Sequence, residues 1–359
     1  MRCVIAGGGT GGHLFPGIAV AEAFVEKEAG NEVLFIGTER GIEVTVLAGG
    51  RFPLRTIQAL PLKGRSFWGK IDALRSIPVA VSEALSILRG FRPEIVLGVG
   101  GYASGPTLLA ARLLGIRRAI HEQNMVPGMT NRILKRVSER IFVSFEETKR
   151  YFPETKTVVT GNPIRKEFFS CSKDRKEGDR FTILVFGGSA GAHRINQATV
   201  GALDFLEGVR CALRFIHQTG RDDFGSVSRS YQEKGFDACV RPFFENMADQ
   251  YRASNLVICR AGASTLAELA ACGRGAILIP YPYAAHQHQL INARRLADLG
   301  AALLIQDREL SGPRLAQSIL ELSSHSEKLR GMERAISRAS RPRAAQEIVD
   351  HCYALVGGQ

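Results

Sequence analysis

The chain has 359 residues, of which 45% are hydrophobic and 23% charged, with a formal net charge of +12. This composition excludes a disordered or fibrous chain and suits a globular protein of two domains. No apolar run approaches the roughly 20 residues that cross a bilayer, and the seven cysteines form no C-x-x-C pair that would indicate a zinc site. The positive charge instead predicts an anionic partner: nucleic acid, anionic lipid or a phosphorylated small molecule.

Short runs rich in valine, isoleucine and leucine alternate with stretches of helical spacing along the whole chain. In the first half these runs are residues 3–7, 33–37, 95–99, 118–122, 140–145 and 157–161. In the second half they are residues 182–188, 213–218, 239–243, 256–262, 276–282 and 302–306. Continuous apolar runs suit parallel strands buried on both faces, and their alternation with helices implies βαβ units. We therefore predict an α/β protein of two doubly wound parallel-sheet domains, with the cleft between them as the default ligand site.

The boundary between the domains is predicted near the Asn-Pro pair at residues 162–163, because this pair favours a break and a charged loop follows at 173–180. The stretch 342–355 has the apolar spacing of a helix. We expect the first domain to comprise residues 1–162 with a C-terminal helix at about 341–359, and the second to comprise residues 163–340.

The first apolar run leads into GGGTGGHLFPG, residues 7–17, which allows three interpretations. Its glycines match the dinucleotide fingerprint, and Glu39 follows the second run where a ribose-binding acid is expected, so an NAD(P)-dependent oxidoreductase is one of them. A cofactor turn needs neither His13 nor Pro16, however. His13 stands at the start of a helix, where it could act as a base near neutral pH. A tight turn that binds no ligand is the third interpretation.

Two further polar loops follow strands of the first half: GVGGYASGP at residues 98–106 and IHEQNMVPGMTN at residues 120–131. Their polar side chains at the carboxyl edge of a sheet favour a lined pocket over a set of solvated loops. The candidates from these loops are Tyr102, His121, Glu122, Asn124 and Asn131.

The second half repeats the pattern with GGSAGAHRIN at residues 187–196 and CRAGASTLAELAACG at residues 259–273. In the latter, residues 263–265 open a helix whose N–H groups could hold a diphosphate. Glu268 lies about one turn further on, where its carboxylate could accept both ribose hydroxyls or only favour the helix terminus. The segment AAHQHQLINA at residues 284–293 is too polar for a core face and favours recognition of sugar hydroxyls.

Seven motifs, GGGTGGHLFPG, GGYASGP, HEQN, GNPIR, GGSAGA, CRAGASTLAEL and AAHQHQLINA, occur in this order from residue 7 to residue 293. Together they resemble the MurG family, transferases that add N-acetylglucosamine (GlcNAc) to undecaprenyl-pyrophosphoryl-N-acetylmuramoyl-pentapeptide in peptidoglycan synthesis. The resemblance implies a GT-B fold of two Rossmann-like domains, UDP-GlcNAc as donor, and inverting transfer to the 4-hydroxyl of N-acetylmuramic acid (MurNAc). It also implies no obligatory metal, although a divalent cation could assist, in agreement with the missing D-x-D pair.

The resemblance also assigns residues to the donor. These are Thr10, Gly11, Gly12, Asn124, Arg165, Ser189, Phe244, Ala263, Ser264, Thr265, Glu268, His288 and Gln289. Glu268 would hold the ribose, and the backbone at Phe244 would meet uracil. Gln289 would contact the GlcNAc together with Asn124.

For the transfer itself we favour His13 as the base, with Glu122 as the second candidate. The residues expected on the acceptor side are Tyr102, His121 and Asn131. A non-catalytic protein that binds a nucleotide or an anionic lipid is the alternative from another class.

Residues 60–92 suggest contact with a membrane surface. The stretch carries six basic residues against Asp72 and Glu83, with Trp68 and several apolar residues between them. A basic, amphipathic, aromatic segment suits an anionic leaflet, although a covering helix with a solvated basic face has the same pattern. Because the first residues show no signal peptide, we expect a peripheral protein on the cytoplasmic face of the plasma membrane, and no nucleic-acid partner.

Overall fold

The computed structural model describes residues 1–39, 41–59, 67–171, 180–188 and 190–358, with side chains described from Ser76 onward in the helix that begins at residue 67. Backbone contacts divide the chain into unit 1, Met1–Arg165 with Arg341–Gln359, and unit 2, Lys166–Ser340. The division falls at Arg165 rather than at residue 162, and the C-terminal segment groups with the N-terminal unit. Each unit is described by itself.

Unit 1 is built on a parallel sheet of seven strands in the order β3-β2-β1-β4-β5-β6-β7. The strands are β1 Arg2–Gly7, β2 Glu32–Thr38, β3 Leu54–Ile57, β4 Ile95–Gly100, β5 Arg117–Glu122, β6 Arg140–Val143 and β7 Thr157–Val159. Six of them match the predicted runs. The edge strand β3 was not predicted, because it is short and Arg55 and Thr56 at its centre are exposed, so it has no continuous apolar run.

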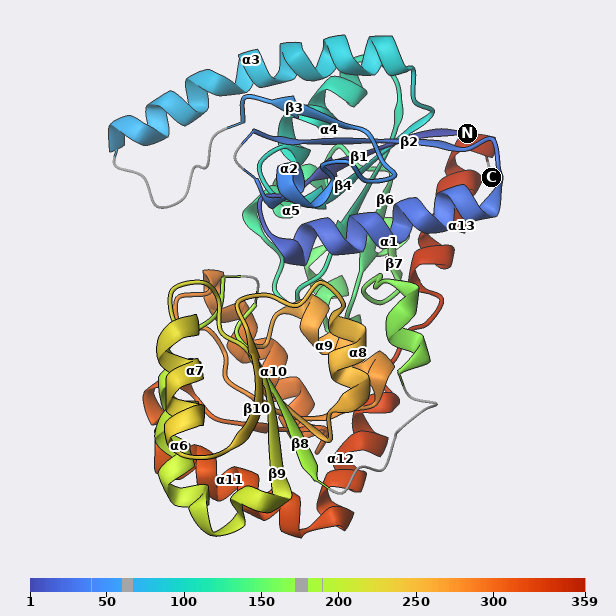
Figure 1. Cartoon of the computed structure of the whole chain (residues 1–359). Coiled ribbons are helices and arrows are strands. Elements are labelled where there is room, and N and C mark those ends of the chain that lie inside the picture. The colour runs from blue at the N-terminus through green and yellow to red at the C-terminus, as the bar shows by residue number, and fades with distance from the viewer. Residues whose placement is uncertain (40, 60–66, 172–179, 189, 359) are drawn as a thin grey trace. The chain divides into compact units, whose positions relative to one another are not determined.

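Helices cover both faces of this sheet. They are α1 Gly11–Lys27, α2 Ile42–Val46, α3 Phe67–Phe91, α4 Ser104–Leu113, α5 Met129–Leu134 and α13 Ala344–Gly357, with 3-10 helices η1 Glu146–Tyr151 and η2 Glu154–Lys156. Cys3 and Ile5 of β1 belong to a core shared with α1 and α13, whereas Val4 belongs to a core shared with α3 and α4. This alternation explains why the strand is apolar on both faces. Figure 1 shows α13 beside α1.

Unit 2 has a parallel sheet of six strands in the order β10-β9-β8-β11-β12-β13, and all six match predicted runs. The strands are β8 Phe181–Phe186, β9 Leu213–Gln218, β10 Asp237–Arg241, β11 Leu256–Cys259, β12 Gly275–Leu278 and β13 Ala302–Leu304. The helices are α6 His193–Leu206, α7 Phe224–Glu233, α8 Met247–Ala253, α9 Ala263–Cys272, α10 His288–Asp298, α11 Gly312–Ser324 and α12 Ser326–Ser337. The 3-10 helices are η3 Lys166–Ser170, η4 Glu207–Ala212, η5 Ala285–Gln287 and η6 Asp307–Glu309.

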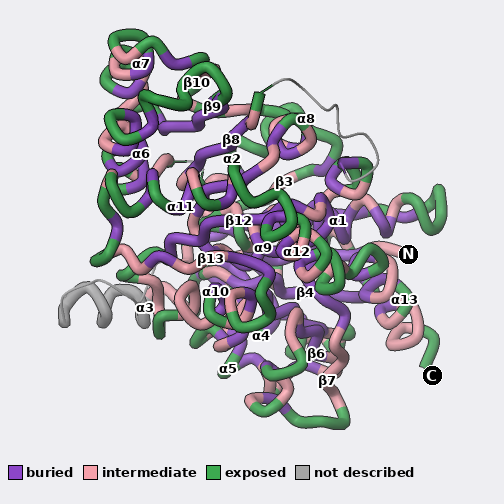
Figure 2. The backbone as a smooth tube through the Cα atoms, turned by 90° about the horizontal axis from the view of Figure 1, so that it is seen from below, coloured by how far each residue is buried: buried purple, intermediate pink, exposed green. Residues whose placement is uncertain are grey.

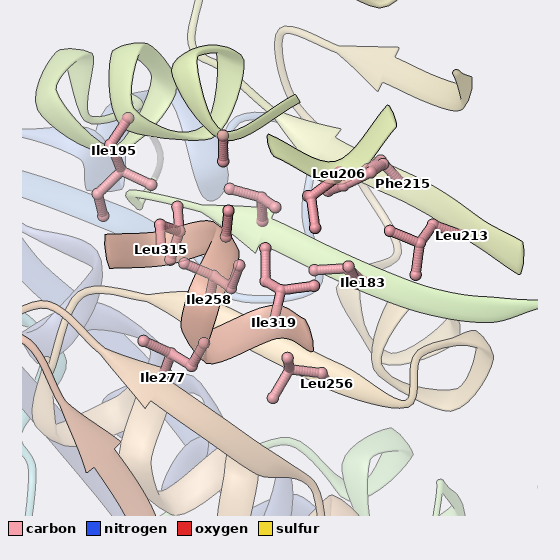
Figure 3. Close-up of a cluster of buried hydrophobic side chains, with 14 of the residues drawn as sticks. Ile183, Ile195, Leu206, Leu213, Phe215, Leu256, Ile258, Ile277, Leu315 and Ile319 are labelled. Atoms are coloured by element: carbon pink, nitrogen blue, oxygen red, sulfur yellow. The ribbon is translucent and has the colours of Figure 1, made fainter. Parts of the chain in front are cut away.

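The core of unit 2 joins neighbouring strands to α11. Ile183, Ile258 and Ile277 come from β8, β11 and β12 and meet Leu315 and Ile319 of α11 in one buried cluster (Figure 3). Figure 2 shows strands of both sheets, such as β4, β8 and β12, buried along their length. The predicted fold class, two doubly wound parallel-sheet domains, is therefore confirmed. Within the described part of the chain, no helix is long and apolar enough to cross a membrane.

In each sheet the strand order reverses beside the first strand of the unit. The reversal lies between β1 and β4 in unit 1 and between β8 and β11 in unit 2. Sheets of this kind bind ligands beyond the carboxyl ends of the strands at this switch point. The glycine-rich turns predicted to bind ligand follow these same four strands, so the fold places them where a ligand is expected.

Candidate active site

The first glycine turn lies against the turn that follows β4. Gly7, Gly8 and Gly9 have φ angles of 147°, 140° and 81°, which side-chain-bearing residues rarely adopt. A Cβ on Gly101 would lie 2.4 Å from the carbonyl oxygen of Gly8, so the two backbones touch. Ser104 Oγ links the two turns. It lies 2.7 Å from the carbonyl oxygen of Ala6 and accepts the N–H of Gly100 at 3.1 Å. Glycine is required here by the packing of two turns.

His13 lies in the first turn of α1, at the edge of this arrangement. Its Nδ1 is 3.2 Å from Oγ1 of Thr10, and its ring lies so close to Gly100 that a Cβ there would be 2.7 Å from His13 Cδ2. The ring is half-buried. If Nδ1 carries the proton and donates it to Thr10, Nε2 is the basic nitrogen. Thr10 and Gly12 are exposed and Gly11 is half-buried at the same helix start.

Glu122 ends β5 and holds together the loop that follows it. Its Oε1 accepts the backbone N–H of Asn124 at 3.0 Å, and its Oε2 accepts the N–H of Gly128 at 3.1 Å and Nδ2 of Asn131 at 2.8 Å. Burial raises the pKa of the Glu122 carboxyl, while these hydrogen bonds oppose the rise. Both oxygens of the Glu122 carboxylate are thus engaged by its own loop, and its role as the second candidate base stays a prediction.

Two of the three residues predicted on the acceptor side are buried. His121 Nε2 lies 3.1 Å from the carbonyl oxygen of Gly161, and burial lowers the His121 pKa to about 4, so the ring is neutral at pH 7. Asn131 Nδ2 also donates to the carbonyl oxygen of His121 at 3.1 Å. Both side chains hydrogen-bond within unit 1, and their contact with the acceptor stays a prediction. Tyr102, the third of these residues, is 43% exposed.

Arg165 and Asn124 are the remaining donor candidates in unit 1. The Arg165 guanidinium carbon lies 5.1 Å from the centre of the Phe15 ring, on the second turn of α1. Both Arg165 and Asn124 are half-buried. The aromatic ring therefore fixes a cation beside the helix that carries His13.

In unit 2 the glycine turn after β8 is tied to the strand next to it. A Cβ on Gly191 would lie 2.0 Å from the carbonyl oxygen of Thr219, so glycine is needed for this approach. Gln218 Nε2 donates to the carbonyl oxygen of Gly188 at 2.9 Å, and its Oε1 accepts the N–H of Phe244 at 2.8 Å. Of the backbone groups of Phe244, only the carbonyl oxygen could therefore meet a uracil. Ser189 lies outside the described residues.

The start of α9 has the features of an anion site. Its N-cap is Gly262, which makes no side-chain cap, and its first turn holds no acidic residue. The first turn of α9 thus adds no negative charge of its own beside the N–H groups of residues 263–265. Glu268 is half-buried further along the helix and accepts a hydrogen bond from Tyr251 Oη at 3.2 Å. Burial, followed by the Glu268 charge, raises the pKa of Tyr251, so the phenol remains a donor to this carboxylate.

The loop before α10 carries the predicted sugar contacts in an unusual backbone conformation. His286 and Gln287 have φ angles of 52° and 53°, and neither is glycine. Gln289 Oε1 accepts the N–H of Tyr281 at 2.9 Å, and His288 Nδ1 lies 2.7 Å from the carbonyl oxygen of Ala285. Left-handed backbone at two consecutive side-chain-bearing residues persists only where the surroundings hold it, which is common at ligand sites. The amide nitrogen of Gln289 is the group that could face a sugar.

Two polar side chains at these sites, Glu43 and Arg260, are not predicted from the sequence. Glu43 is buried and accepts the N–H of Gly9 at 2.7 Å, whereas Glu39, the acid expected by the dinucleotide interpretation, is exposed. The available signal for Glu43 was an acidic residue two positions after Gly41, in the segment that follows β2. Arg260 lies just before the start of α9. Nothing in the sequence singles it out except its place in the motif CRAGASTLAEL. Among the described residues, no three His, Cys, Asp or Glu side chains are grouped so that they could hold a metal.

Comparison with known proteins decides the family. Residues 3–143 match the model of the glycosyltransferase family 28 N-terminal domain, and residues 182–348 match that of the C-terminal domain. The chain belongs to glycosyltransferase family 28. Membership in family 28 agrees with the GT-B arrangement of two Rossmann-like domains, and the oxidoreductase interpretation has no support.

Relatives within family 28 are similar over nearly the whole chain. A Myxococcus xanthus protein is 48% identical over 99% of this chain and 93% of its own length. A Citrifermentans bemidjiense protein is 50% identical over 97% of this chain and 98% of its own length. Both are named UDP-N-acetylglucosamine–N-acetylmuramyl-(pentapeptide) pyrophosphoryl-undecaprenol N-acetylglucosamine transferase.

Solved structures agree with this assignment. The crystal structure of MurG from Acinetobacter baumannii is 33% identical, covers 98% of this chain and 99% of its own, and has a TM-score of 0.77. The resemblance to the MurG family is thus confirmed. A UDP-GlcNAc 2-epimerase from Neisseria meningitidis has a TM-score of 0.68 at 14% identity, which shows a shared fold alone.

Proposed function

We propose that the protein transfers GlcNAc from UDP-GlcNAc to the 4-hydroxyl of MurNAc in undecaprenyl-pyrophosphoryl-MurNAc-pentapeptide, with inversion at the anomeric carbon. The full-length similarity to relatives that bear this transferase name carries the proposal. The start of α9, at the switch point of the unit 2 sheet, supports it independently, because it is suited to a phosphorylated ligand.

Unit 2 holds the groups suited to the donor. The start of α9 at residues 263–265 offers N–H groups and a positive helix end to the UDP diphosphate. Glu268, oriented by Tyr251, can accept the ribose hydroxyls. The carbonyl oxygen of Phe244 can accept from uracil, and the Gln289 amide can donate to the sugar.

In the proposed reaction the MurNAc 4-hydroxyl attacks C1 of GlcNAc as the bond from C1 to the UDP diphosphate oxygen breaks. The hydroxyl proton passes to His13, which is half-buried and oriented by Thr10. Negative charge grows on the leaving UDP, where the α9 terminus can stabilise it. Loss of one such preorganised donor typically costs about 3 kcal/mol of transition-state stabilisation.

This assignment favours His13 over Glu122 as the base. The Glu122 carboxylate is buried and accepts hydrogen bonds from its own loop on both oxygens. The His13 ring lies at the sheet edge among exposed residues, so a bound hydroxyl could reach it.

The reaction as proposed needs no metal bound by the protein, since the α9 terminus supplies the positive end of a dipole to the diphosphate. A divalent cation would act on the UDP diphosphate itself. Assays with Mg²⁺ and with EDTA test whether any cation is obligatory: activity retained in EDTA is expected, and activity abolished by EDTA and restored by Mg²⁺ would show that the transfer requires a divalent cation.

Unit 1 is further proposed to bind the surface of an anionic membrane, on the cytoplasmic face, through residues 60–92 and the helices beside them. Residues 60–66 and the side chains of 67–75 lie outside the description, so the support comes from neighbouring helices. Large apolar side chains are exposed one turn apart on α4, at Leu109 and Leu113, and on α5, at Met129 and Ile133. Exposed arginines, Arg112 and Arg132, lie on the same helices, as expected of a surface that binds anionic lipid.

The decisive experiment is transfer of labelled GlcNAc from UDP-GlcNAc to a purified lipid-linked MurNAc-pentapeptide. We expect a lipid product that carries GlcNAc in β-1,4 linkage, and equimolar release of UDP. UDP-GlcNAc binding without transfer would instead support a non-catalytic nucleotide-binding protein. Thermal stabilisation by NADH but not by UDP-GlcNAc would support the oxidoreductase alternative.

A further inference from the structure

Glu43 of α2 is a fully buried acid at the first glycine turn, and none of the roles given above uses it. Its Oε2 accepts the N–H of Gly9 at 2.7 Å. Its Oε1 accepts the N–H of Thr38 at 2.8 Å and lies 3.2 Å from the Thr38 hydroxyl. Both carboxylate oxygens are thus engaged with backbone at the carboxyl ends of β1 and β2.

Three glycines from separate segments make the space that this carboxylate occupies. A Cβ on Gly8 would lie 2.5 Å from Glu43 Cδ, and a Cβ on Gly37 would lie 2.6 Å from Glu43 Cγ. A Cβ on Gly41 would lie 2.0 Å from Oε2. Real Cβ atoms do not approach other atoms this closely, so the turn, the end of β2 and the start of α2 together form a cradle for one carboxylate.

The hydrogen bond from the Gly9 N–H to the Glu43 carboxylate is unusual for a glycine turn in this position. Glycine turns after a first parallel strand commonly give their backbone N–H groups to a ligand phosphate. Here the N–H of Gly9 is given to an acid of the same chain. The N–H of Gly9 is therefore not available to the pyrophosphate of a dinucleotide, which gives a physical reason why the fingerprint match misleads.

We propose that Glu43 is a positioning residue for the transfer reaction: an internal anion that fixes Gly9 and thereby orients Thr10 and His13. The inference rests on the proposed function. Gly9 precedes Thr10, whose hydroxyl lies 3.2 Å from His13 Nδ1, so the path from the carboxylate to the imidazole is one peptide and one side-chain contact. Glu43 itself touches neither substrate.

The test compares Glu43→Gln with Glu139→Gln. The first variant keeps the shape but places an amide NH₂ against an N–H donor, so one of the two backbone bonds is lost. The control Glu139 lies at the opposite edge of the same sheet, where it pairs with Arg117 and Arg118. Glu43→Gln should lower kcat by about 10-fold or more, since small misplacement of a reacting group is costly. The affinity for free UDP should stay within about twofold, because the groups proposed to hold the uracil, the ribose and the diphosphate lie in unit 2.

A purely structural role would lower kcat only in proportion to the folded fraction. We therefore also expect the pH profile of kcat to change for Glu43→Gln, because a displaced Thr10 alters the contact at His13 Nδ1, and to stay unchanged for Glu139→Gln. Hydrogen exchange should accelerate in the peptide spanning residues 4–17 and not in peptides of unit 2. Unchanged kcat, pH profile and exchange in Glu43→Gln would overturn the proposal.

If Glu43→Gln fails to fold, Thr38→Val provides the second variant, since it removes only the hydroxyl contact to Glu43 Oε1. A drop in kcat with unchanged affinity for free UDP is expected, and wild-type kinetics would reject the inference. Wild-type protein that transfers no GlcNAc would refute the proposed function instead, while the exchange measurement would still test whether Glu43 holds the turn.

Discussion

Nη1 of Arg260 lies 2.7 Å from Oδ1 of Asp307 and 3.2 Å from the carbonyl oxygens of both Ile279 and Pro280. The two side chains are 12% and 15% exposed. Residues 279 and 280 lead into the loop with the left-handed pair at 286 and 287, and Gln289 follows. The ion pair thus anchors the beginning of the segment that we propose contacts the donor sugar.

Replacement of Asp307 by alanine should leave the Arg260 guanidinium partly buried without its carboxylate. Breaking such a pair typically costs about 3 kcal/mol of unfolding free energy. We also expect the KM for UDP-GlcNAc to rise by about tenfold, equivalent to about 1.4 kcal/mol, because the loop start is released. Urea unfolding and donor-saturation kinetics measure the two effects.

Glu309→Ala is the matched control for Asp307→Ala. Glu309 is in the same 3-10 helix, but its side chain is 51% exposed and its contact with Arg308 is 3.6 Å long. Exposed pairs of this kind contribute under about 1 kcal/mol. Equal effects of the two substitutions on stability and on donor KM would contradict the anchoring role of Asp307.

His13→Ala should abolish most of the transfer without affecting donor binding. Positioned general bases contribute about 10²-fold to 10⁴-fold to rate, so kcat should fall in that range. His325, an exposed histidine that precedes α12 on unit 2, provides the control variant His325→Ala, with wild-type kinetics expected. Wild-type turnover in His13→Ala, with UDP affinity unchanged, would show that His13 is not the base.

The strands were more predictable than the site, for a physical reason. A strand buried on both faces needs a continuous apolar run, so β8 or β11 can be read directly from the sequence. The polar loop at 120–131 has no comparable rule. His121 and Glu122 look like ligand contacts in the sequence, but tertiary packing buries both. Only the folded chain shows which side of the loop each residue faces.

The same limit explains why Glu43 was missed. Its partners Gly9 and Thr38 come from two other segments, and its cradle needs glycines from three. The dinucleotide interpretation predicts a ribose-binding acid just after the second strand, and this pattern points to Glu39. The sequence therefore indicates the glycine turn after β1. Only the fold shows that the acid buried against this turn is Glu43.

Acidification should destabilise unit 1 through His121. Burial lowers its pKa to about 4, so the folded state binds fewer protons than the unfolded state between about pH 6.5 and pH 4, and stability is lost as pH falls through this window. Between pH 7 and pH 5 the loss due to His121 is about 2 kcal/mol. The variant His121→Gln should show a correspondingly smaller decrease, measured by hydrogen exchange of unit 1 peptides. A pH dependence equal to that of the wild type would contradict this account.

Membrane binding is expected to depend on the exposed apolar side chains of α4 and α5. Leu113 and Met129 are 70% and 63% exposed. Replacing either side chain by a charged one should remove its apolar contact with the bilayer interface. Leu113→Glu combined with Met129→Glu should reduce co-sedimentation with vesicles containing anionic lipid, and added salt should weaken wild-type binding.

The control for the membrane variants is Phe205→Glu, because Phe205 is 55% exposed on α6 of unit 2 and belongs to none of the helices of the proposed surface. It should bind vesicles as the wild type does. Transfer to a short, water-soluble analogue of the acceptor should be unchanged in the doubly substituted protein, since neither residue is assigned to the reaction. Vesicle binding that is insensitive to anionic lipid, or unaffected by the double substitution, would place the membrane contact elsewhere on the chain.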